Sequence, residues 1–259
     1  MESGQPARKK VKRGTLDGFI VSSIKSEVKS PEDDEKSDCS KLDSPLKWKK
    51  ITAEDLCLDF CPQFYSKHEA DLIFKMLEED LEYFTGALSK VFVYGKWHNV
   101  PRKQVTYGEP GLSYKFSGIT VPSQPWPQVL LDIKDKLSKA TGNYFNFVLV
   151  NRYNDGSDYM GEHRDNEKEL DPLAPIASVS FGQTRDFIFT HGSTKYKKGS
   201  PPGKKKIMPV KLVLEHGSVL LMQYPTNTYW YHSLPRRKTA HGVRINLTFR
   251  KVNMSNCGK

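Results

Sequence analysis

The chain has 259 residues, of which 37% are hydrophobic, enough for one large domain or two small ones with a packed core. The formal charge of +10 favours a polyanionic partner, nucleic acid before a membrane surface, with simple solubilising charge as the alternative. The sequence shows no apolar run of membrane-spanning length, no secretion signal and no Cys-x-x-Cys pair, which argues against membrane, secreted and zinc-ribbon proteins and favours a soluble intracellular one.

Residues 1–47 are predicted to be a disordered tail, because they are rich in Lys, Ser, Glu and Pro and poor in large apolar residues. The basic run at residues 8–13 is interpreted as a nuclear-import signal, which places the protein in the nucleus, or as a non-specific nucleic-acid arm. One helical turn after it would present three apolar side chains together: Leu16, Phe19 and Ile20. This pattern resembles the sliding-clamp-binding motif of replication and repair proteins, although Arg13 stands where that motif favours Gln.

Two amphipathic helices are predicted in the second segment, residues 48–142. Ser66 and Glu69 have the spacing of a capping box, and apolar residues keep helical spacing from there through Tyr83. Residues 129–137 have the pattern of the second helix. Both helices are expected to pack on a core and to have a structural role.

Between these helices, residues 86–118 are predicted to form short strands in which basic and aromatic residues interleave. Tyr114 and Phe116 fall on one face of such a strand. A surface of this composition can contact phosphates and stack on bases. An ordinary hairpin with half-buried aromatic residues is the alternative.

The third segment, residues 143–259, is predicted to be a catalytic core of short strands. The strands are expected at residues 144–153, 176–182, 185–189, 210–214, 217–222 and 243–252. Short strands separated by Gly and Pro turns, with no regular helices between them, favour a β-sandwich or jelly roll. A loop between the third and fourth of these strands carries six lysines suited to a phosphate backbone: Lys195, Lys197, Lys198, Lys204, Lys205 and Lys206.

The first candidate metal ligands are His163 and Asp165. On an extended strand, residues i and i+2 share a face, so this imidazole and this carboxylate could hold two positions of a metal ion. Most His-x-Asp tripeptides are ordinary surface pairs, so the hypothesis needs a third ligand. His232 is the best of the seven histidines for that role because several predicted strands separate it from Asp165. Two histidines and one carboxylate form the facial triad of non-haem Fe(II) enzymes.

The last predicted strand carries polar residues on one face and apolar residues on the other. The polar face has four members: Arg244, Asn246, Thr248 and Arg250. An inward-facing arginine is costly unless it meets an anion, and a guanidinium matches a carboxylate through two hydrogen bonds. The pattern therefore favours an anionic cosubstrate over an edge strand with a solvated polar face.

Together, the His163-x-Asp165 pair, His232 and the polar face of the last strand resemble the signature of the AlkB family of iron(II)- and 2-oxoglutarate-dependent dioxygenases. The resemblance covers about residues 48–252. It implies a mainly β fold with flanking helices, in which a double-stranded β-helix (jelly roll) carries an N-terminal nucleotide-recognition lid. It also implies Fe(II), 2-oxoglutarate and molecular oxygen as cofactors, with the triad on the iron. The residues that would hold 2-oxoglutarate are Asn151, Tyr153, Arg244, Thr248 and Arg250.

Within this family, the AlkB homologue two branch, which repairs alkylated bases in duplex DNA, is the most similar. The similarity is carried by residues 83–88, 95–98, 116–118 and 225–228. It implies oxidative demethylation of N1-methyladenine and N3-methylcytosine in double-stranded DNA after the base has been flipped out. An RNA or single-strand demethylase, a 2-oxoglutarate-dependent protein hydroxylase and a non-enzymatic scaffold recruited by the clamp are the alternatives. A monomer is expected.

The resemblance also implies contacts with the substrate. The intercalating hairpin of this branch matches Val93, Tyr94, Gly95 and Lys96. Tyr94 stands where the family typically has Phe, and Asn166 stands where this branch often has Asp. The other implied contacts are Arg102, Tyr114, Lys115, Phe116, Asn166, Glu167, Arg236, Arg237 and Lys238.

Overall fold

The computed structural model describes residues 45–253 except 94, 117–118 and 195–206. Residues 1–44 of the predicted tail, with its basic run and clamp-binding-like motif, lie outside the described residues, and so do the six lysines of the predicted loop. Within the described ranges, no helix is both long enough and apolar enough to cross a membrane.

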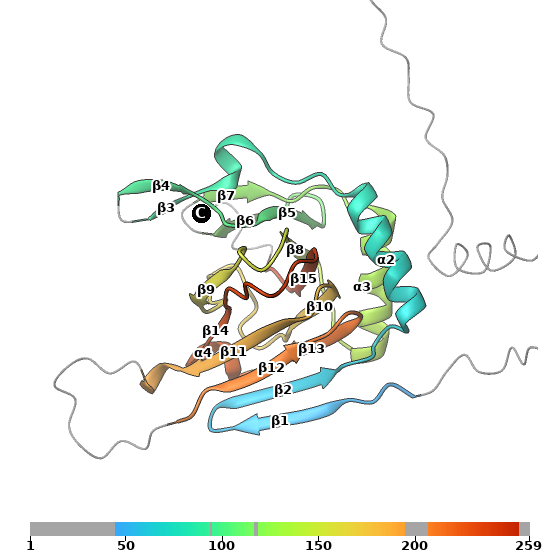
Figure 1. Ribbon diagram of the computed structural model, residues 1–259, viewed down its shortest axis with the longest axis vertical. Coiled ribbons are helices and arrows are strands. Elements are labelled where there is room, and N and C mark those ends of the chain that lie inside the picture. Colours follow the sequence, from blue (N-terminus) through green and yellow to red (C-terminus); the bar gives the residue numbers. More distant parts are fainter. Residues whose placement is uncertain (1–44, 94, 117–118, 195–206, 254–259) are drawn as a thin grey trace, which may run out of the picture. The chain divides into compact units, whose positions relative to one another are not determined.

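Two antiparallel sheets form the body of the protein (Figure 1). The larger sheet has the order β1-β2-β13-β10-β15-β8-β5, and the smaller has the order β12-β11-β14-β9. The strands of the larger sheet are β1 (Lys49–Ala53), β2 (Leu56–Cys61), β5 (Lys103–Gly108), β8 (Phe147–Tyr153), β10 (Ile176–Gly182), β13 (Ser218–Met222) and β15 (Arg244–Arg250). Those of the smaller sheet are β9 (Met160–His163), β11 (Arg185–His191), β12 (Val210–Leu214) and β14 (Trp230–Leu234).

The core between the two sheets is built by alternation along the strands. Leu149 and Tyr153 of β8 lie in one buried cluster with Phe187 and Phe189 of β11 and with Trp230 of β14. Because side chains alternate across a strand, Val150 and Arg152 of β8 face the other side of the larger sheet. Facing sheets with helices outside confirm the predicted mainly β, jelly-roll fold.

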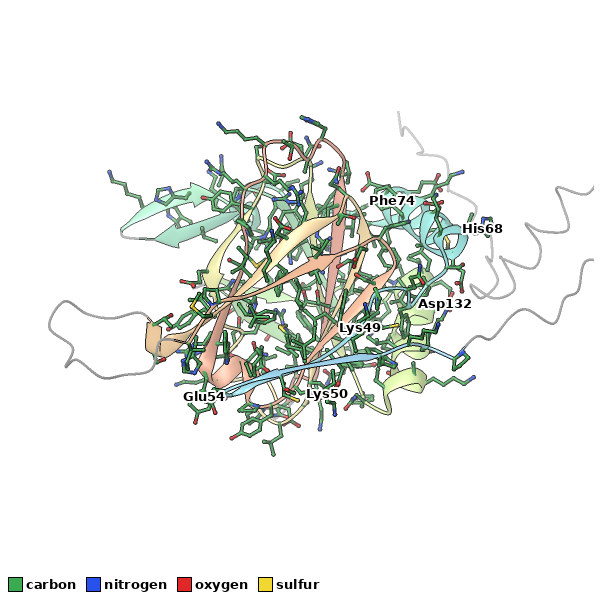
Figure 2. The ribbon with its side chains drawn as sticks, turned by 60° about the horizontal axis from the view of Figure 1, so that its bottom comes forward. Lys49, Lys50, Glu54, His68, Phe74 and Asp132 are labelled. Carbon is green, nitrogen blue, oxygen red and sulfur yellow. The ribbon has the colours of Figure 1, made fainter. Side chains whose placement is uncertain are left out.

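The helices α2 (Lys67–Asp80) and α3 (Gln128–Thr141) bury apolar stripes against the larger sheet (Figure 1). The predicted capping box is present: Glu69 N–H donates to Ser66 Oγ, and Ser66 N–H donates to the Glu69 carboxylate. The helix ends three residues before the predicted limit at Tyr83. Phe74 of α2 (labelled in Figure 2) contacts His216 at a ring-centroid distance of 6.3 Å. Short helical turns occur at η1 (Gly86–Ser89), η2 (Gly192–Thr194) and α4 (Thr226–Tyr229).

The predicted division between residues 48–142 and 143–259 is not a division between sheets. In the larger sheet β2 pairs with β13 and β5 pairs with β8, so strands from before residue 143 flank those from after it. Pairing between strands far apart in sequence depends on backbone register, which local composition does not encode. At one edge of this sheet, β1 exposes Lys49 and Lys50 (Figure 2), which discourages pairing with another chain.

Two hairpins adjoin β5 in the sequence. The first is β3 (Lys90–Val93) with β4 (Lys96–Asn99), and the second is β6 (Ser113–Phe116) with β7 (Ile119–Pro122). Gly95 makes the first turn with a φ of 75°, a conformation that favours glycine. Figure 1 shows both hairpins on the same side of the molecule as β5. They occupy the segment that was predicted to form the nucleotide-recognition lid.

Candidate metal and cosubstrate site

The fold brings His163, Asp165 and His232 together. His163 ends β9 and is the register partner of His232 on β14, while Asp165 follows two residues after His163. The two imidazole rings lie 4.3 Å apart between centroids. One potential ligand atom from each residue falls within 4.8 Å of the others. The cluster has the donor set of a non-haem Fe(II) site, and an ion at its centre would join all three side chains.

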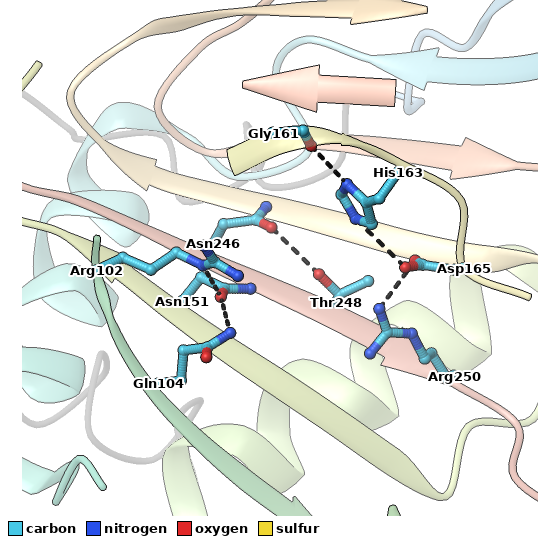
Figure 3. A network of polar contacts seen from close by, with 9 residues as sticks. All are labelled: Arg102, Gln104, Asn151, Gly161, His163, Asp165, Asn246, Thr248 and Arg250. Carbon is cyan, nitrogen blue, oxygen red and sulfur yellow. Dashed lines mark hydrogen bonds and ion pairs between the residues drawn. The ribbon is translucent and has the colours of Figure 1, made fainter. Parts of the chain in front are cut away.

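Neighbouring groups orient the His163 ring (Figure 3). Its Nδ1 lies 2.9 Å from the carbonyl oxygen of Gly161, and a carbonyl only accepts, so Nδ1 carries the hydrogen. Nε2 is thereby directed toward Asp165, at 3.6 Å from Oδ1. A histidine that donates to a backbone carbonyl through one ring nitrogen and offers the other to the metal is the usual arrangement in metalloproteins.

The protonation states of His232 and Asp165 also suit metal binding. Burial, with a smaller contribution from the nearby His163, lowers the pKa of His232 to about 3, so this imidazole is neutral. Burial alone would lower the pKa of His163, but its hydrogen bond and attraction to Asp165 raise that pKa. Burial would raise the pKa of Asp165, but Arg250 and the two histidines hold it well below its usual range. His232 Nδ1 is buried without a hydrogen-bond partner among the described residues, a site that a metal ion would fit.

Arg250 connects this cluster to the polar face of β15. Its Nη2 donates to Asp165 Oδ2 at 2.8 Å, and both side chains are buried. On the same face, Thr248 Oγ1 donates to Asn246 Oδ1 at 3.2 Å (Figure 3). The arginine therefore compensates the charge of a candidate metal ligand, a role beyond the predicted contact with 2-oxoglutarate.

Arg244, at the other end of this face, is a buried cation without an anion. Its guanidinium donates to Ser180 Oγ at 2.8 Å and to the Leu214 carbonyl at 3.2 Å, and no carboxylate of the described residues pairs with it. Its Nε is buried without an acceptor. Burial lowers its pKa to about 10, so the group stays charged at neutral pH. Such an uncompensated charge fits an anionic ligand such as a carboxylate.

These groups line one cavity of about 870 Å³. Of the predicted site residues, eleven line it: Arg102, Asn151, Tyr153, His163, Asp165, Asn166, Glu167, His232, Arg244, Thr248 and Arg250. Apolar walls come from both sheets, including Leu149, Met222 and Phe187, whose ring lies 5.3 Å from that of His232. One cavity is thus lined by the candidate metal ligands, by the buried cation Arg244 and by apolar side chains.

Some predicted substrate residues cannot be placed in this cavity. Tyr94 lies outside the described residues, as do the side chains of Val93, Tyr114, Lys115 and Phe116, whose strands β3 and β6 are described. Gly95 forms the turn of its hairpin, and Lys96 is exposed beside it on β4.

The predicted phosphate contacts have different surroundings. Arg236 stacks over the ring of Tyr159 at 4.4 Å, next to the cavity, and Lys238 is exposed. Arg237 is paired with Asp186 at 3.2 Å, so part of its charge is compensated within the protein. Arg236 and Lys238 are therefore more available to a phosphate than Arg237.

Two residues near the site were not predicted. Gln104 of β5 lines the cavity and donates to Asn151, and Arg164 donates to the Thr228 carbonyl at 2.6 Å while stacking over the Tyr231 ring at 4.4 Å. The alternating pattern of residues 103–108 puts Gln104 on one strand face but does not reveal that β8 is its neighbour. Arg164 stands between two candidate ligands, and only its position suggests a role.

The chain matches a known protein family and is similar to several proteins. The family model described as the 2OG-Fe(II) oxygenase superfamily matches residues 58–250. The proteins named DNA oxidative demethylase ALKBH2 from Mus musculus and Homo sapiens are each 56% identical to this chain over 205 residues, which cover 79% of it and 84% and 77% of those proteins. Alpha-ketoglutarate-dependent dioxygenase alkB homolog 3 from Bos taurus is 36% identical over 204 residues, covering 76% of this chain and 66% of that protein.

A solved structure is similar as well. The chain titled "The structure of OsALKBH1" superimposes with a TM-score of 0.51 at 17% sequence identity. The match covers 78% of this chain and 100% of that chain. At this identity the likeness supports the fold alone.

Proposed function

The chain belongs to the 2OG-Fe(II) oxygenase superfamily, and from this premise we propose that it oxidatively demethylates N1-methyladenine and N3-methylcytosine in double-stranded DNA. The observation that carries the proposal is the single cavity that holds the His163, Asp165 and His232 cluster together with the buried Arg244. The DNA substrate is supported by relatives named DNA oxidative demethylase that are 56% identical to the chain.

The residues of the cavity divide into two binding sets. Fe(II) would be held by His163, Asp165 and His232, and 2-oxoglutarate by Asn151, Tyr153, Arg244, Thr248 and Arg250. When bound, Fe(II) would let molecular oxygen oxidise 2-oxoglutarate to succinate and carbon dioxide and, with its second oxygen atom, hydroxylate a methyl carbon on a base nitrogen, after which the hydroxymethyl group leaves as formaldehyde.

The protein's own groups prepare this chemistry. Arg250 compensates the charge of Asp165, so the carboxylate remains ionised although it is buried. Burial keeps His232 neutral, which leaves a lone pair for the metal. Arg244 offers a fixed positive charge to a carboxylate, while Phe187 and Met222 present apolar surface to the cavity. Together these groups bind, orient and keep water away from the reacting atoms.

A base inside a duplex cannot reach a cavity between two sheets, so we propose that it is flipped out. The hairpins beside β5 are the proposed nucleotide-recognition lid, with Tyr94 as the wedge and with Tyr114, Lys115 and Phe116 against the flipped base. Asn166 and Glu167 line the cavity and are the proposed contacts to its edge. Arg236 and Lys238 are the proposed phosphate contacts.

The test compares duplex and single-stranded oligonucleotides that carry one N3-methylcytosine, with demethylated base and formaldehyde as the readouts. The duplex should be repaired faster, and His232→Ala should abolish turnover on both substrates because it removes a metal ligand. A strong preference for the single strand would favour the alternative demethylase of single strands or RNA. Full activity without 2-oxoglutarate would overturn the proposal.

We also propose that the protein acts as a monomer in the nucleus and is recruited by the replication sliding clamp. The support is the basic run at residues 8–13 and the Leu16, Phe19 and Ile20 pattern of the sequence. The double substitution Leu16→Ala/Phe19→Ala should remove the clamp from a pull-down with the full chain. Retention equal to that of the unmodified chain would contradict recruitment through this segment.

A further inference from the structure

The amide of Asn151 is held from two sides. Arg102 Nε donates to its Oδ1 at 2.8 Å, and Gln104 Nε2 donates to the same oxygen at 2.8 Å (Figure 3). Gln104 and Asn151 are register partners on the neighbouring strands β5 and β8, so the contact is direct across the sheet. All three residues line the cavity.

This arrangement determines which way the amide points. A guanidinium has only donors, so the Asn151 atom that faces Arg102 must be the oxygen. The amide nitrogen, Nδ2, must then point away from Arg102. Nδ2 is buried and meets no acceptor among the described residues. A buried donor without an acceptor is costly, and a ligand oxygen in the cavity would satisfy it.

Arg102 also ties this amide to two other parts of the protein. It follows shortly after the hairpin strand β4, and its Nη1 donates to the Tyr159 carbonyl at 3.3 Å, just before β9 begins with Met160. In return, the Tyr159 N–H donates to the Pro101 carbonyl at 3.4 Å. Burial lowers the pKa of Arg102, and no described carboxylate forms an ion pair with it. The guanidinium is therefore engaged with the protein interior, in addition to the substrate contact that the resemblance implies.

We propose that Arg102 and Gln104 are positioning residues for the cosubstrate: they fix the Asn151 amide so that its NH₂ group donates to an oxygen of 2-oxoglutarate. The inference rests on the proposed function, because it takes 2-oxoglutarate as the ligand of the cavity. Neither side chain needs to touch the cosubstrate. Their effect is to determine whether Asn151 presents a donor or an acceptor to it.

The decisive variant is Gln104→Glu in the full chain loaded with Mn(II), which binds in place of Fe(II) without turnover. A carboxylate at this position accepts where the glutamine donated, so it repels the Asn151 oxygen that Arg102 holds and the amide is no longer fixed with its NH₂ group toward the anionic cosubstrate. The Kd of 2-oxoglutarate, measured by titration calorimetry, should rise about tenfold to a hundredfold, as for the loss of a hydrogen bond to a charged group. In turnover with Fe(II), the KM for 2-oxoglutarate should rise while kcat at saturation changes little.

Two further variants keep the test decisive. Arg102→Met removes the other donor and should weaken 2-oxoglutarate binding in the same direction, even if Gln104→Glu fails to fold. Lys103→Gln, at an exposed neighbouring position, is the matched control and should bind 2-oxoglutarate as the unmodified chain does. Mn(II) affinity is measured in the same samples and should stay within twofold in all three.

The outcomes separate the two proposals. Unchanged 2-oxoglutarate binding in Gln104→Glu and Arg102→Met overturns the inference while the unmodified chain still demethylates DNA. Equal losses of Mn(II) and 2-oxoglutarate binding overturn it too, since they indicate general damage to the fold. If the unmodified chain itself neither binds 2-oxoglutarate nor demethylates DNA, the proposed function fails first.

Discussion

Arg244 is the residue whose environment most clearly requires a ligand. Its charge is buried among a hydroxyl and backbone carbonyls, with no carboxylate partner in the described ranges. Burying a cation without an anion costs stability in the empty protein, and this cost is recovered when an anion binds. Arg244 therefore lowers the stability of the free protein and raises its affinity for an anionic ligand.

Both effects, on stability and on affinity, can be measured with Arg244→Met, which fills a similar volume without charge. The free energy of unfolding of the ligand-free protein should not fall, because the desolvated charge is gone. The affinity for 2-oxoglutarate should fall at least tenfold, since a charge-assisted hydrogen bond contributes about 1.5–3 kcal/mol. Chemical denaturation and titration calorimetry measure the two quantities. A destabilised variant with normal 2-oxoglutarate binding would contradict this account.

Arg164 joins the two segments that carry the candidate ligands. The pairing of β9 with β14 shifts register between His232 and Leu234, so backbone hydrogen bonds alone do not fix the ligand spacing there. Arg164, which lines the cavity, bridges the segments through the Thr228 carbonyl and the ring of Tyr231, the residue before His232. These contacts lead us to expect that Arg164 helps to hold the candidate ligands in place.

Arg164→Ala should accordingly weaken Mn(II) binding about tenfold, as expected when a group that orients metal ligands is lost. The Mn(II) affinity of Arg164→Lys should lie between those of Arg164→Ala and the unmodified chain, since an ammonium keeps the charge but cannot stack as a planar group. Arg236→Ala is the control, because it removes an arginine stacked at the same 4.4 Å distance on Tyr159, which precedes β9 and does not adjoin a candidate ligand in the sequence. If the control loses as much affinity as Arg164→Ala, stacking at this position has no special role.

The sequence was informative about residues whose types carry the chemistry. His163, Asp165, His232 and Arg244 were identified from spacing, alternation and resemblance, and the structure brings them to one cavity. Gln104 was missed because glutamine has no characteristic chemistry, and its role depends on which strand lies beside β5. Positioning residues act through geometry, so pattern alone does not find them.

At the scale of elements, the start of α2 is stabilised by its capping box and by a neighbouring helix. The Glu69 carboxylate accepts from Ser66 N–H at 2.8 Å and from Lys136 Nζ of α3 at 2.9 Å. Burial alone would raise the pKa of Glu69, but these hydrogen bonds lower it overall. Because the folded pKa is depressed, this stabilisation is present above the unfolded pKa of about 4.3 and is lost as pH falls through the folded value.

Ser66→Ala should therefore lower the free energy of unfolding by about 1 kcal/mol at pH 7, as for other lost caps. Glu69→Gln should also destabilise at pH 7, and its stability should decline less steeply than that of the unmodified chain below about pH 4.3. Glu79→Gln, at an exposed position of α2, serves as the control. Urea unfolding at several pH values gives these quantities, and parallel pH profiles for Glu69→Gln and the unmodified chain would contradict the argument.

The elements themselves were largely predictable, because alternation and capping are local signals. The strands β10 and β12 match the predicted ranges, and α2 begins at the predicted cap. The sheet order was not predictable: nothing local to residues 49–61 shows that β1 and β2 extend the sheet of the catalytic core. The strand pattern that begins near residue 143 suggested a segment boundary there, but the larger sheet contains strands from both sides of it.

At the scale of the whole molecule, the metal and the cosubstrate should add to stability, since the unfolded chain has no preformed site for either. At a hundred times its Kd, a ligand that binds only the folded state contributes about 2.7 kcal/mol. For a folded region of this size, that corresponds to a rise in Tm of roughly 5–10 °C. Adding a chelator should reverse the shift in a thermal scan, and His232→Ala should show none. A Tm that changes neither on adding Mn(II) nor on adding chelator would contradict a structured metal site.

The strand β5 has a further consequence. It lies at the edge of the larger sheet, and the two hairpins leave from its opposite ends in the sequence. Changes in the length or composition of either hairpin therefore affect only the edge of the sheet, and the pairing of β8 with β15 keeps its register. Under selection, such a scaffold can acquire new targets by remodelling its outer loops while its oxidation chemistry is inherited unchanged.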